Sequence, residues 1–157
     1  MITLAIGKII ATNRKALRDY FIEETYEAGL ALWGSEVKSL RAGKVSLIDS
    51  FAQVKKAEVF LYNMHVSPYE FDTVVRPEPK RTRKLLLHKK EIRKLIGKTE
   101  ERGYALVPLR VYFSGRFAKV ELGLGRGKKL FDKRREMASK TANREIEREL
   151  KERTRSR

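Results

Sequence analysis

The sequence changes character after Gly125, and this change limits what the chain can fold into. Before Gly125 short apolar segments recur, whereas residues 126–157 hold 13 basic and 6 acidic side chains. The sizeable apolar residues of that final stretch are Leu130, Phe131, Met137, Ile146 and Leu150. So little apolar surface cannot offset about 1 to 2 kcal/mol of backbone entropy for each ordered residue. We therefore expect a folded domain over residues 1–125 and a basic tail over residues 126–157 that is disordered when free.

The first 125 residues contain segments of strand length with alternating or β-branched residues. Each segment is bounded by Gly, Asn, Pro or charged residues, as strands usually are. They are Tyr20–Thr25, Ser50–Lys55, Val59–Tyr62, Leu106–Phe113 and Ala118–Leu124. Hairpin turns are expected at Lys55–Glu58 and Ser114–Phe117. The pattern predicts a mainly β fold, in which an antiparallel β-barrel of the oligonucleotide-binding type is the closest architecture.

Helices are expected at the periphery of this sheet. The segment Ser35–Ala42 reads as a helix that Ser35 caps and the following glycine closes. A second helix is predicted from His88 to Gly97, where apolar residues recur at helical spacing. A short helical turn at Arg14–Arg18 precedes the first strand.

The tail has the features of a conditional helix. It contains no Pro and no Gly after Gly127. Glutamates stand four residues before a base in the pairs Glu136/Lys140, Glu147/Lys151 and Glu149/Arg153. Such pairs stabilise a helix by about 0.2 to 0.5 kcal/mol each. A polyanion that neutralises the excess positive charge would allow the tail to fold as a helix along it. A solvated charged tail without a role is the alternative.

The charge of the chain points to a polyanionic partner. Lys and Arg total 36 against 20 Asp and Glu, which gives a formal net charge of +16. RNA fits better than a membrane, because no apolar run approaches the ~20 residues of a spanning helix. The N-terminus lacks the order of a secretory signal, and the chain has no cysteine. These features favour the reducing cytoplasm as the location and argue against a membrane partner.

Basic side chains gather in sequence groups that could contact phosphate. The groups are Arg14, Lys15 and Arg18; Lys38, Arg41 and Lys44; and Lys80–Lys84, which precedes the apolar run Leu85–Leu87. Phosphate contacts supply affinity with little sequence information. Structured RNA is the ligand class that suits such groups, because proteins recognise it by shape, by 2′-hydroxyls and by stacking of unpaired bases.

The sequence shows no pattern of a metal site or a catalytic pair. Neither His65 nor His88 has further nitrogen or sulfur ligands at a usual spacing, and Glu91 three positions after His88 favours a capping role. Glu23 and Glu24 would face opposite sides of a strand, which disfavours a paired acid and base. We therefore predict no catalytic residue, no metal, no cofactor and no enzymatic activity.

Several motifs, taken in order, resemble one family, the SsrA-binding proteins, also called small protein B. The motifs are Asn13, Asp19–Gly29, Gly34–Lys44, Arg83–Lys89, Gly127–Lys129 and Asp132–Arg134. They cover almost the whole chain after the first dozen residues. The resemblance implies a non-enzymatic RNA-binding adaptor, which binds the tRNA-like domain of transfer-messenger RNA and delivers it to stalled ribosomes for trans-translation.

The resemblance also implies RNA-binding positions, which fall on Asn13, Arg18, Glu27, Leu86, His88 and Lys119. Arg18 and Lys119 suit phosphate, Leu86 is an apolar platform, and His88 can donate or stack. Glu27 needs another explanation, because a carboxylate repels phosphate. It could accept hydrogen bonds from base edges or a 2′-hydroxyl, or it could orient a neighbouring arginine. A purely structural role is the alternative.

For the tail, the resemblance implies entry into the decoding centre and a helix along the empty messenger channel of the ribosome. The positions concerned are Gly127, Lys128, Lys129, Phe131, Asp132, Lys133 and Arg134. Phe131 stands where family members often have His or Tyr. It can still stack on a base of ribosomal RNA, which is worth about 1 to 3 kcal/mol, but it cannot make their hydrogen bond.

The implied partners are transfer-messenger RNA, the small-subunit ribosomal RNA, and the alanyl-transfer-messenger RNA complex with elongation factor Tu. The protein is expected to be a monomer. A general ribosomal or RNA-chaperone protein that binds structured RNA is the alternative function. An RNA-processing enzyme is disfavoured, because the sequence shows neither an acid–base pair nor a metal site.

Overall fold

A computed structural model describes residues 7–69, 71, 76–101, 103–128 and 144–151. The strands in chain order are β1 (Ile9–Thr12), β2 (Tyr20–Leu30), β3 (Val45–Ser46), β4 (Phe51–Lys55), β5 (Glu58–Tyr62), β6 (His65–Val66), β7 (Arg83–Leu86), β8 (Tyr104–Ser114) and β9 (Phe117–Gly127). The helices are α1 (Arg14–Asp19), α2 (Gly34–Arg41) and α3 (Lys89–Glu100), and residues 144–151 are also helical.

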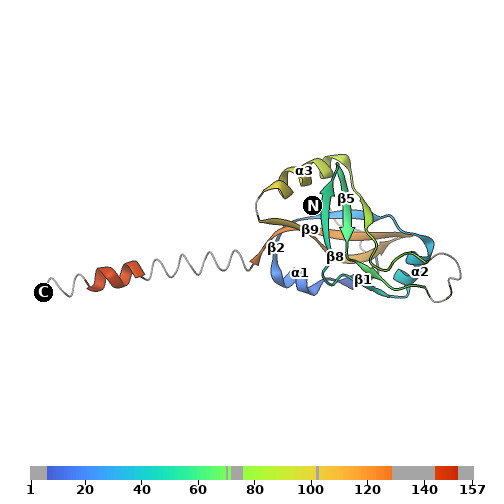
Figure 1. Ribbon diagram of the computed structural model, residues 1–157, viewed down its shortest axis with the longest axis horizontal. Coiled ribbons are helices and arrows are strands. Elements are labelled where there is room, and N and C mark those ends of the chain that lie inside the picture. The colour runs from blue at the N-terminus through green and yellow to red at the C-terminus, as the bar shows by residue number, and fades with distance from the viewer. Residues whose placement is uncertain (1–6, 70, 72–75, 102, 129–143, 152–157) are drawn as a thin grey trace.

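The large sheet closes on itself. Its strand order is β1-β8-β4-β5-β7-β2-β9, and β9 pairs in addition with β8. All of these pairs are antiparallel. The strands from β8 through β4, β5, β7 and β2 to β9 therefore form a ring, with the helices at its periphery (Figure 1). The prediction of a mainly β, antiparallel fold with peripheral helices is confirmed.

The inside of the ring is the main hydrophobic core. Along β2, Tyr26, Ala28 and Leu30 are buried and alternate with residues that remain partly exposed. Leucines and valines of the neighbouring strands complete the interior, and Leu40 of α2 and Leu95 of α3 are fully buried in the same cluster. Full burial of one such side chain stabilises the fold by about 1.5 to 3 kcal/mol, so alternation along the strands determines the inner face.

Strands β2 and β9 approach each other closely near the end of β9. A Cβ atom on Gly125 would lie 2.0 Å from the carbonyl oxygen of Phe21. Only glycine fits such a contact without moving the backbone. The strand then continues to Gly127, which pairs with Tyr20 at the start of β2. The tail therefore leaves the body beside α1, which ends at Asp19.

Two predicted helix boundaries are wrong. Helix α2 begins at Gly34 with Trp33 as its N-cap, so Ser35 lies inside the helix. Its first turn is closed by Glu36, whose Oε1 accepts a hydrogen bond of 3.0 Å from the Trp33 backbone N–H. Helix α3 continues through Gly97 to Glu100. Gly97 has no positive φ, so nothing at that position ends the helix.

The sequence pattern did not predict the strands β1, β3, β6 and β7. The omission of β7 matters most, because this strand pairs with both β5 and β2 and so closes one side of the ring. Its inward residues are Arg83 and Leu85, and its outward residues are Lys84 and Leu86. A charged residue on the inner face breaks the usual alternation of apolar and polar residues, and the segment therefore resembled a basic patch.

Beyond residue 128 the described part of the tail is the helical stretch at residues 144–151, and all residues of this stretch are exposed. The pair Glu147/Lys151 lies within it. The other two predicted pairs, and with them most of the predicted conditional helix, involve residues outside the described ranges. None of the helices in the described ranges combines the length and the apolar character that crossing a bilayer requires.

Candidate nucleic-acid interface

A row of paired residues crosses the outer face of the ring. Leu86 of β7 lies opposite Gly29 of β2. Gly29 is in turn paired with Lys119 of β9, and Lys119 is paired with Tyr112 of β8. Directly paired residues project to one face of an antiparallel sheet, and Glu27, two positions before Gly29, shares that face. We name Glu27, Leu86, Tyr112 and Lys119 the β-face cluster.

Glu27 connects two members of the β-face cluster. Its Oε1 lies 3.4 Å from Nζ of Lys119, and its Oε2 accepts a hydrogen bond of 2.7 Å from the Tyr112 hydroxyl. The side chains of Glu27 and Lys119 are 26% and 29% exposed. The ammonium group of Lys119 is therefore held at the surface of the sheet, where it can still reach a phosphate.

Tyr112 makes a contact to Glu27 that the sequence analysis did not predict. It is fully buried, and burial together with the hydrogen bond to Glu27 raises the pKa of its phenol. The phenol therefore keeps its proton at neutral pH and remains a donor to Glu27. Within the segment Leu106–Phe113, the sequence alone indicates only that Tyr112 is an apolar strand residue. The hydrogen bond from its hydroxyl to Glu27 is visible only in the folded structure.

Leu86 forms an exposed apolar surface next to Lys119. Its side chain is 55% exposed, which is unusual for a leucine in a paired strand. A Cβ atom on Gly29 would lie 3.3 Å from Cβ and 3.6 Å from Cδ1 of Leu86, so the leucine lies over the glycine. An apolar platform beside a cation is the combination that unpaired RNA bases and their phosphates require.

His88 lies at the edge of this face, two residues after Leu86. It is exposed and occupies the N-cap position of α3. Its backbone N–H donates a hydrogen bond of 3.3 Å to Oε1 of Glu91, which is the contact expected of a capping glutamate. His88 is therefore accessible to a ligand just beyond the end of β7.

The remaining two predicted RNA-binding residues lie elsewhere, on α1. Asn13 is buried and caps this helix, because its Oδ1 accepts a hydrogen bond of 3.2 Å from the Ala16 backbone N–H. Its Nδ2 donates a hydrogen bond of 3.0 Å to the carbonyl oxygen of Pro108 in β8. Arg18 is 76% exposed and pairs with Asp19 at 3.4 Å. Asn13 thus anchors the helix that presents Arg18 to solvent.

Strand β2 separates the two groups. Its first residue, Tyr20, follows α1 directly, whereas Glu27 lies seven positions further along the strand. At about 3.3 Å per residue these positions are roughly 23 Å apart. The six residues that the sequence singled out therefore divide between two regions of the surface.

The basic group Lys80–Lys84 does not form one surface patch. Arg83 is fully buried and lies 2.6 Å from Oε2 of Glu36, which is itself 2% exposed. Arg81 also donates a hydrogen bond to Glu36, and Arg83 donates a hydrogen bond of 2.6 Å to the carbonyl oxygen of Met64. Burial alone would raise the pKa of Glu36, but hydrogen bonds from Arg81, from the Trp33 backbone and from Arg83 hold that pKa below its ordinary value of 4.5.

At the start of the tail, two cationic side chains lie over aromatic rings. The guanidinium of Arg126 lies 4.5 Å from the ring centre of Tyr104, and Nζ of Lys128 lies 5.2 Å from that of Phe21. Gly127 lies between them at the end of β9. The other predicted tail positions, Lys129, Phe131, Asp132, Lys133 and Arg134, lie outside the described residues.

These features define a class of protein. A ring of antiparallel strands presents cations beside apolar and aromatic side chains on its outer face, in a chain of net charge +16. Across the described ranges, no cluster of three His, Asp or Glu side chains is arranged to hold a metal ion. The fold and the site are those of a small basic protein that binds structured nucleic acid.

Comparison with known proteins identifies the family. The family model for the SmpB protein matches residues 10–152. The SsrA-binding protein of Anoxybacillus flavithermus is 63% identical over 147 residues, which cover 94% of this chain and 96% of the relative. That of Geobacillus thermodenitrificans is also 63% identical over 147 residues, covering 94% of this chain and 95% of the relative.

A solved structure agrees with this assignment. It is described as "tmRNA-SmpB: a journey to the center of the bacterial ribosome", and it matches with a TM-score of 0.65 at 54% identity. The match covers 78% of this chain and 85% of the other. The chain belongs to the SmpB family of SsrA-binding proteins.

Proposed function

We propose that this protein binds the tRNA-like domain of transfer-messenger RNA through the β-face cluster. It acts as a non-enzymatic adaptor that brings this RNA to stalled ribosomes for trans-translation. One observation carries the proposal: Glu27, Leu86 and Lys119 are far apart in the sequence but meet on one outer face of the ring. Relatives at 63% identity are SsrA-binding proteins, and the description of a matching solved structure names tmRNA, SmpB and the bacterial ribosome.

Each residue of the β-face cluster has a distinct role in this proposal. Lys119 neutralises a phosphate, and Leu86 supports an unpaired base. Glu27 orients Lys119 through their 3.4 Å contact, and Tyr112 holds Glu27 from below. The carboxylate thus acts mainly on a neighbouring cation of the protein. This role is close to the alternative in which Glu27 orients an arginine, but the cation is a lysine. His88 extends the same face toward α3.

The second region, on α1, offers a further contact to RNA. Arg18 contributes a phosphate contact there, and Asn13 acts indirectly because it anchors α1. The tail leaves the body beside α1 and enters the decoding centre and the empty messenger channel, where the ribosomal RNA neutralises its charge. The tail positions that the family resemblance assigns to the decoding centre are Gly127, Lys128, Lys129, Phe131, Asp132, Lys133 and Arg134. The protein works in the cytoplasm together with ribosomes, and elongation factor Tu joins the complex through the alanylated RNA.

Truncation of the tail tests this division of labour. Removal of residues 129–157 retains Gly127 beside Tyr20 and Lys128 on Phe21. The truncated chain should bind the tRNA-like RNA within about twofold of the full chain, because the β-face cluster is intact. It should fail to support tagging in a reconstituted translation system. Equal loss of both activities would contradict the proposal.

The same binding assay separates the adaptor from the alternative function. A fragment of ribosomal RNA of similar length serves as the competitor for the full chain. An adaptor should prefer the tRNA-like RNA strongly, because phosphate attraction alone does not distinguish the two RNAs. Equal affinity for both would instead support a general ribosomal or RNA-chaperone protein.

A further inference from the structure

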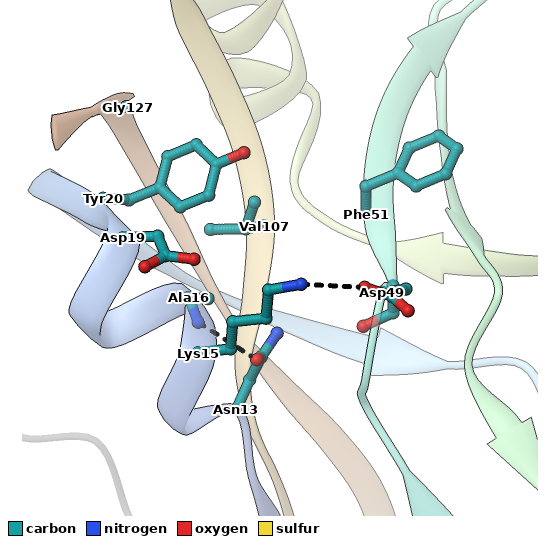
Figure 2. Close-up of a pocket in the computed structure, with 10 residues that line it drawn as sticks. Asn13, Lys15, Ala16, Asp19, Tyr20, Asp49, Phe51, Val107 and Gly127 are labelled. Carbon is teal, nitrogen blue, oxygen red and sulfur yellow. Dashed lines mark hydrogen bonds and ion pairs between the residues drawn. The ribbon is translucent and has the colours of Figure 1, made fainter. Parts of the chain in front are cut away.

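A cavity lies beneath α1, in the region of the surface away from the β-face cluster. Its volume is about 610 Å³, and its lining includes Lys15, Tyr20, Asp49, Phe51, Val107 and Gly127 (Figure 2). The lining comes from α1, from the starts of β2 and β4, from β8 and from the end of β9. Pockets that bind small organic groups typically measure about 300 to 1,000 Å³, so one nucleotide fits this space.

The floor and walls of the cavity suit a flat ring. Figure 2 shows the Tyr20 ring lying over Val107, with its hydroxyl group directed across the cavity toward the side of β4 that carries Phe51. Val107 is 4% exposed and belongs to a small apolar cluster under α1. Phe51 is held by stacking on Tyr62, with ring centres 5.2 Å apart. The Phe51 ring points away from Tyr20 in Figure 2, so Tyr20 is the aromatic side chain on which a nucleobase can stack in this cavity.

The polar groups of the cavity select among ligands. Asp19 and Asp49 contribute two carboxylates to the lining. Asp49 lies 3.2 Å from Nζ of Lys15, and Asp19 lies 3.4 Å from Nε of Arg18. The cavity therefore favours groups that donate hydrogen bonds, although the chain as a whole carries a net charge of +16. Asp49 is 71% exposed, so its carboxylate has room to accept a further hydrogen bond.

Helix α1 also carries positive charge. Lys15 lines the cavity, and Arg14 and Arg18 lie on the same helix and are exposed. A nucleotide presents both characters, because its phosphate is anionic while its base is flat and carries donors. Adenine, cytosine and guanine have an exocyclic amino group that can donate a hydrogen bond to a carboxylate, whereas uracil has no such group.

We propose that the cavity beneath α1 binds one unpaired nucleobase that carries an exocyclic amino group. The base stacks against Tyr20, its amino group donates to Asp49, and its phosphate lies on Arg14 and Arg18. This inference rests on the proposed function, because it requires an RNA partner. The base comes either from transfer-messenger RNA or from ribosomal RNA, and both sources present the same chemistry.

The variant Tyr20→Leu tests the stacking and identifies the source of the base. Its affinity is measured for the tRNA-like RNA and, separately, for purified small ribosomal subunits. Binding to one of the two should weaken by about tenfold, while binding to the other stays within about twofold. Tyr20→Phe should retain most of the affinity, because stacking is preserved. Phe71→Leu, at an aromatic that is 77% exposed and does not line the cavity, is the control.

The variant Asp49→Asn gives a second test that does not depend on the core. Asp49 has a positive φ of 60°, which asparagine also adopts readily, so the backbone is preserved. If only long-range attraction mattered, removal of a negative charge would strengthen RNA binding. If the carboxylate of Asp49 accepts a hydrogen bond from a base, RNA binding by Asp49→Asn should weaken about fivefold or more. Glu101→Gln, another exposed carboxylate, controls for the change in charge.

The results separate this inference from the proposed function. If the unmodified chain binds neither RNA, the proposed function fails. If the unmodified chain binds but Tyr20→Leu and Asp49→Asn behave like their controls, the nucleobase site is disproved. Urea denaturation of each variant shows whether Tyr20→Leu has lost stability. If Tyr20→Leu has lost stability, the sign of the Asp49→Asn effect on RNA binding decides whether the nucleobase site exists.

Discussion

Glu36 and Glu27 are both carboxylates that join partners from distant parts of the chain, but their surroundings differ. Glu36 is 2% exposed and pairs with Arg83, which is fully buried, and with Arg81. Glu27 is 26% exposed and pairs with Lys119 and with the Tyr112 hydroxyl. In a chain with so many cations, a pairing by itself does not distinguish a structural carboxylate from one that serves a ligand. Burial makes the distinction, because a buried ion pair cannot reach RNA.

The largest expected effect is the loss of stability in Glu36→Gln. The amide leaves the guanidinium of Arg83 buried without a counter-charge, and breaking a buried pair in this way costs about 3 to 5 kcal/mol. Glu27→Gln is the matched control. It should lower the free energy of unfolding by about 1 kcal/mol or less, because that site is partly solvated. Urea denaturation at neutral pH measures both, and similar losses for the two variants would refute the comparison.

Acid should reproduce part of this effect. The pKa of Glu36 is lowered in the folded protein, so its unfolded form binds a proton more readily than the folded form. The stabilisation is therefore fully present above the ordinary pKa of 4.5 and is lost as the pH falls through the lower folded value. We expect the difference in unfolding free energy between the unmodified chain and Glu36→Gln to shrink below about pH 4.5. A constant difference from pH 7 to pH 3 would show that Glu36 does not titrate in this way.

The smallest expected effect concerns RNA binding through Lys119. Lys119→Ala should weaken binding to the tRNA-like RNA several-fold and reduce the slope of log affinity against log salt by about 1, because one phosphate contact is lost. Glu27→Gln should also weaken binding, but it should leave the slope nearly unchanged, since Lys119 keeps its charge. Affinities measured over a series of salt concentrations test both expectations. An unchanged slope in Lys119→Ala would show that this lysine does not contact phosphate.

Much of the fold could be predicted from the sequence because local pattern and local structure agree in most segments. The five predicted strands and the helices at α1, α2 and α3 are all present, and the sheet is antiparallel. The most consequential miss, β7, has a tertiary cause. In β7 the inner face carries Arg83, whose counter-charge comes from α2. No reading of the segment alone could show that a distant glutamate makes this burial possible.

The sequence by itself determined the strand-forming segments, the basic character of the chain and its resemblance to a family, since each depends on residue types and short spacings. Tertiary structure alone decided which charged residues reach solvent and which residues meet. Pairing of β7, β2, β9 and β8 joins Leu86, Lys119 and Tyr112 on one face, while the length of β2 separates them from Arg18. The physical reason is that strand pairing and burial depend on contacts between segments far apart in the chain.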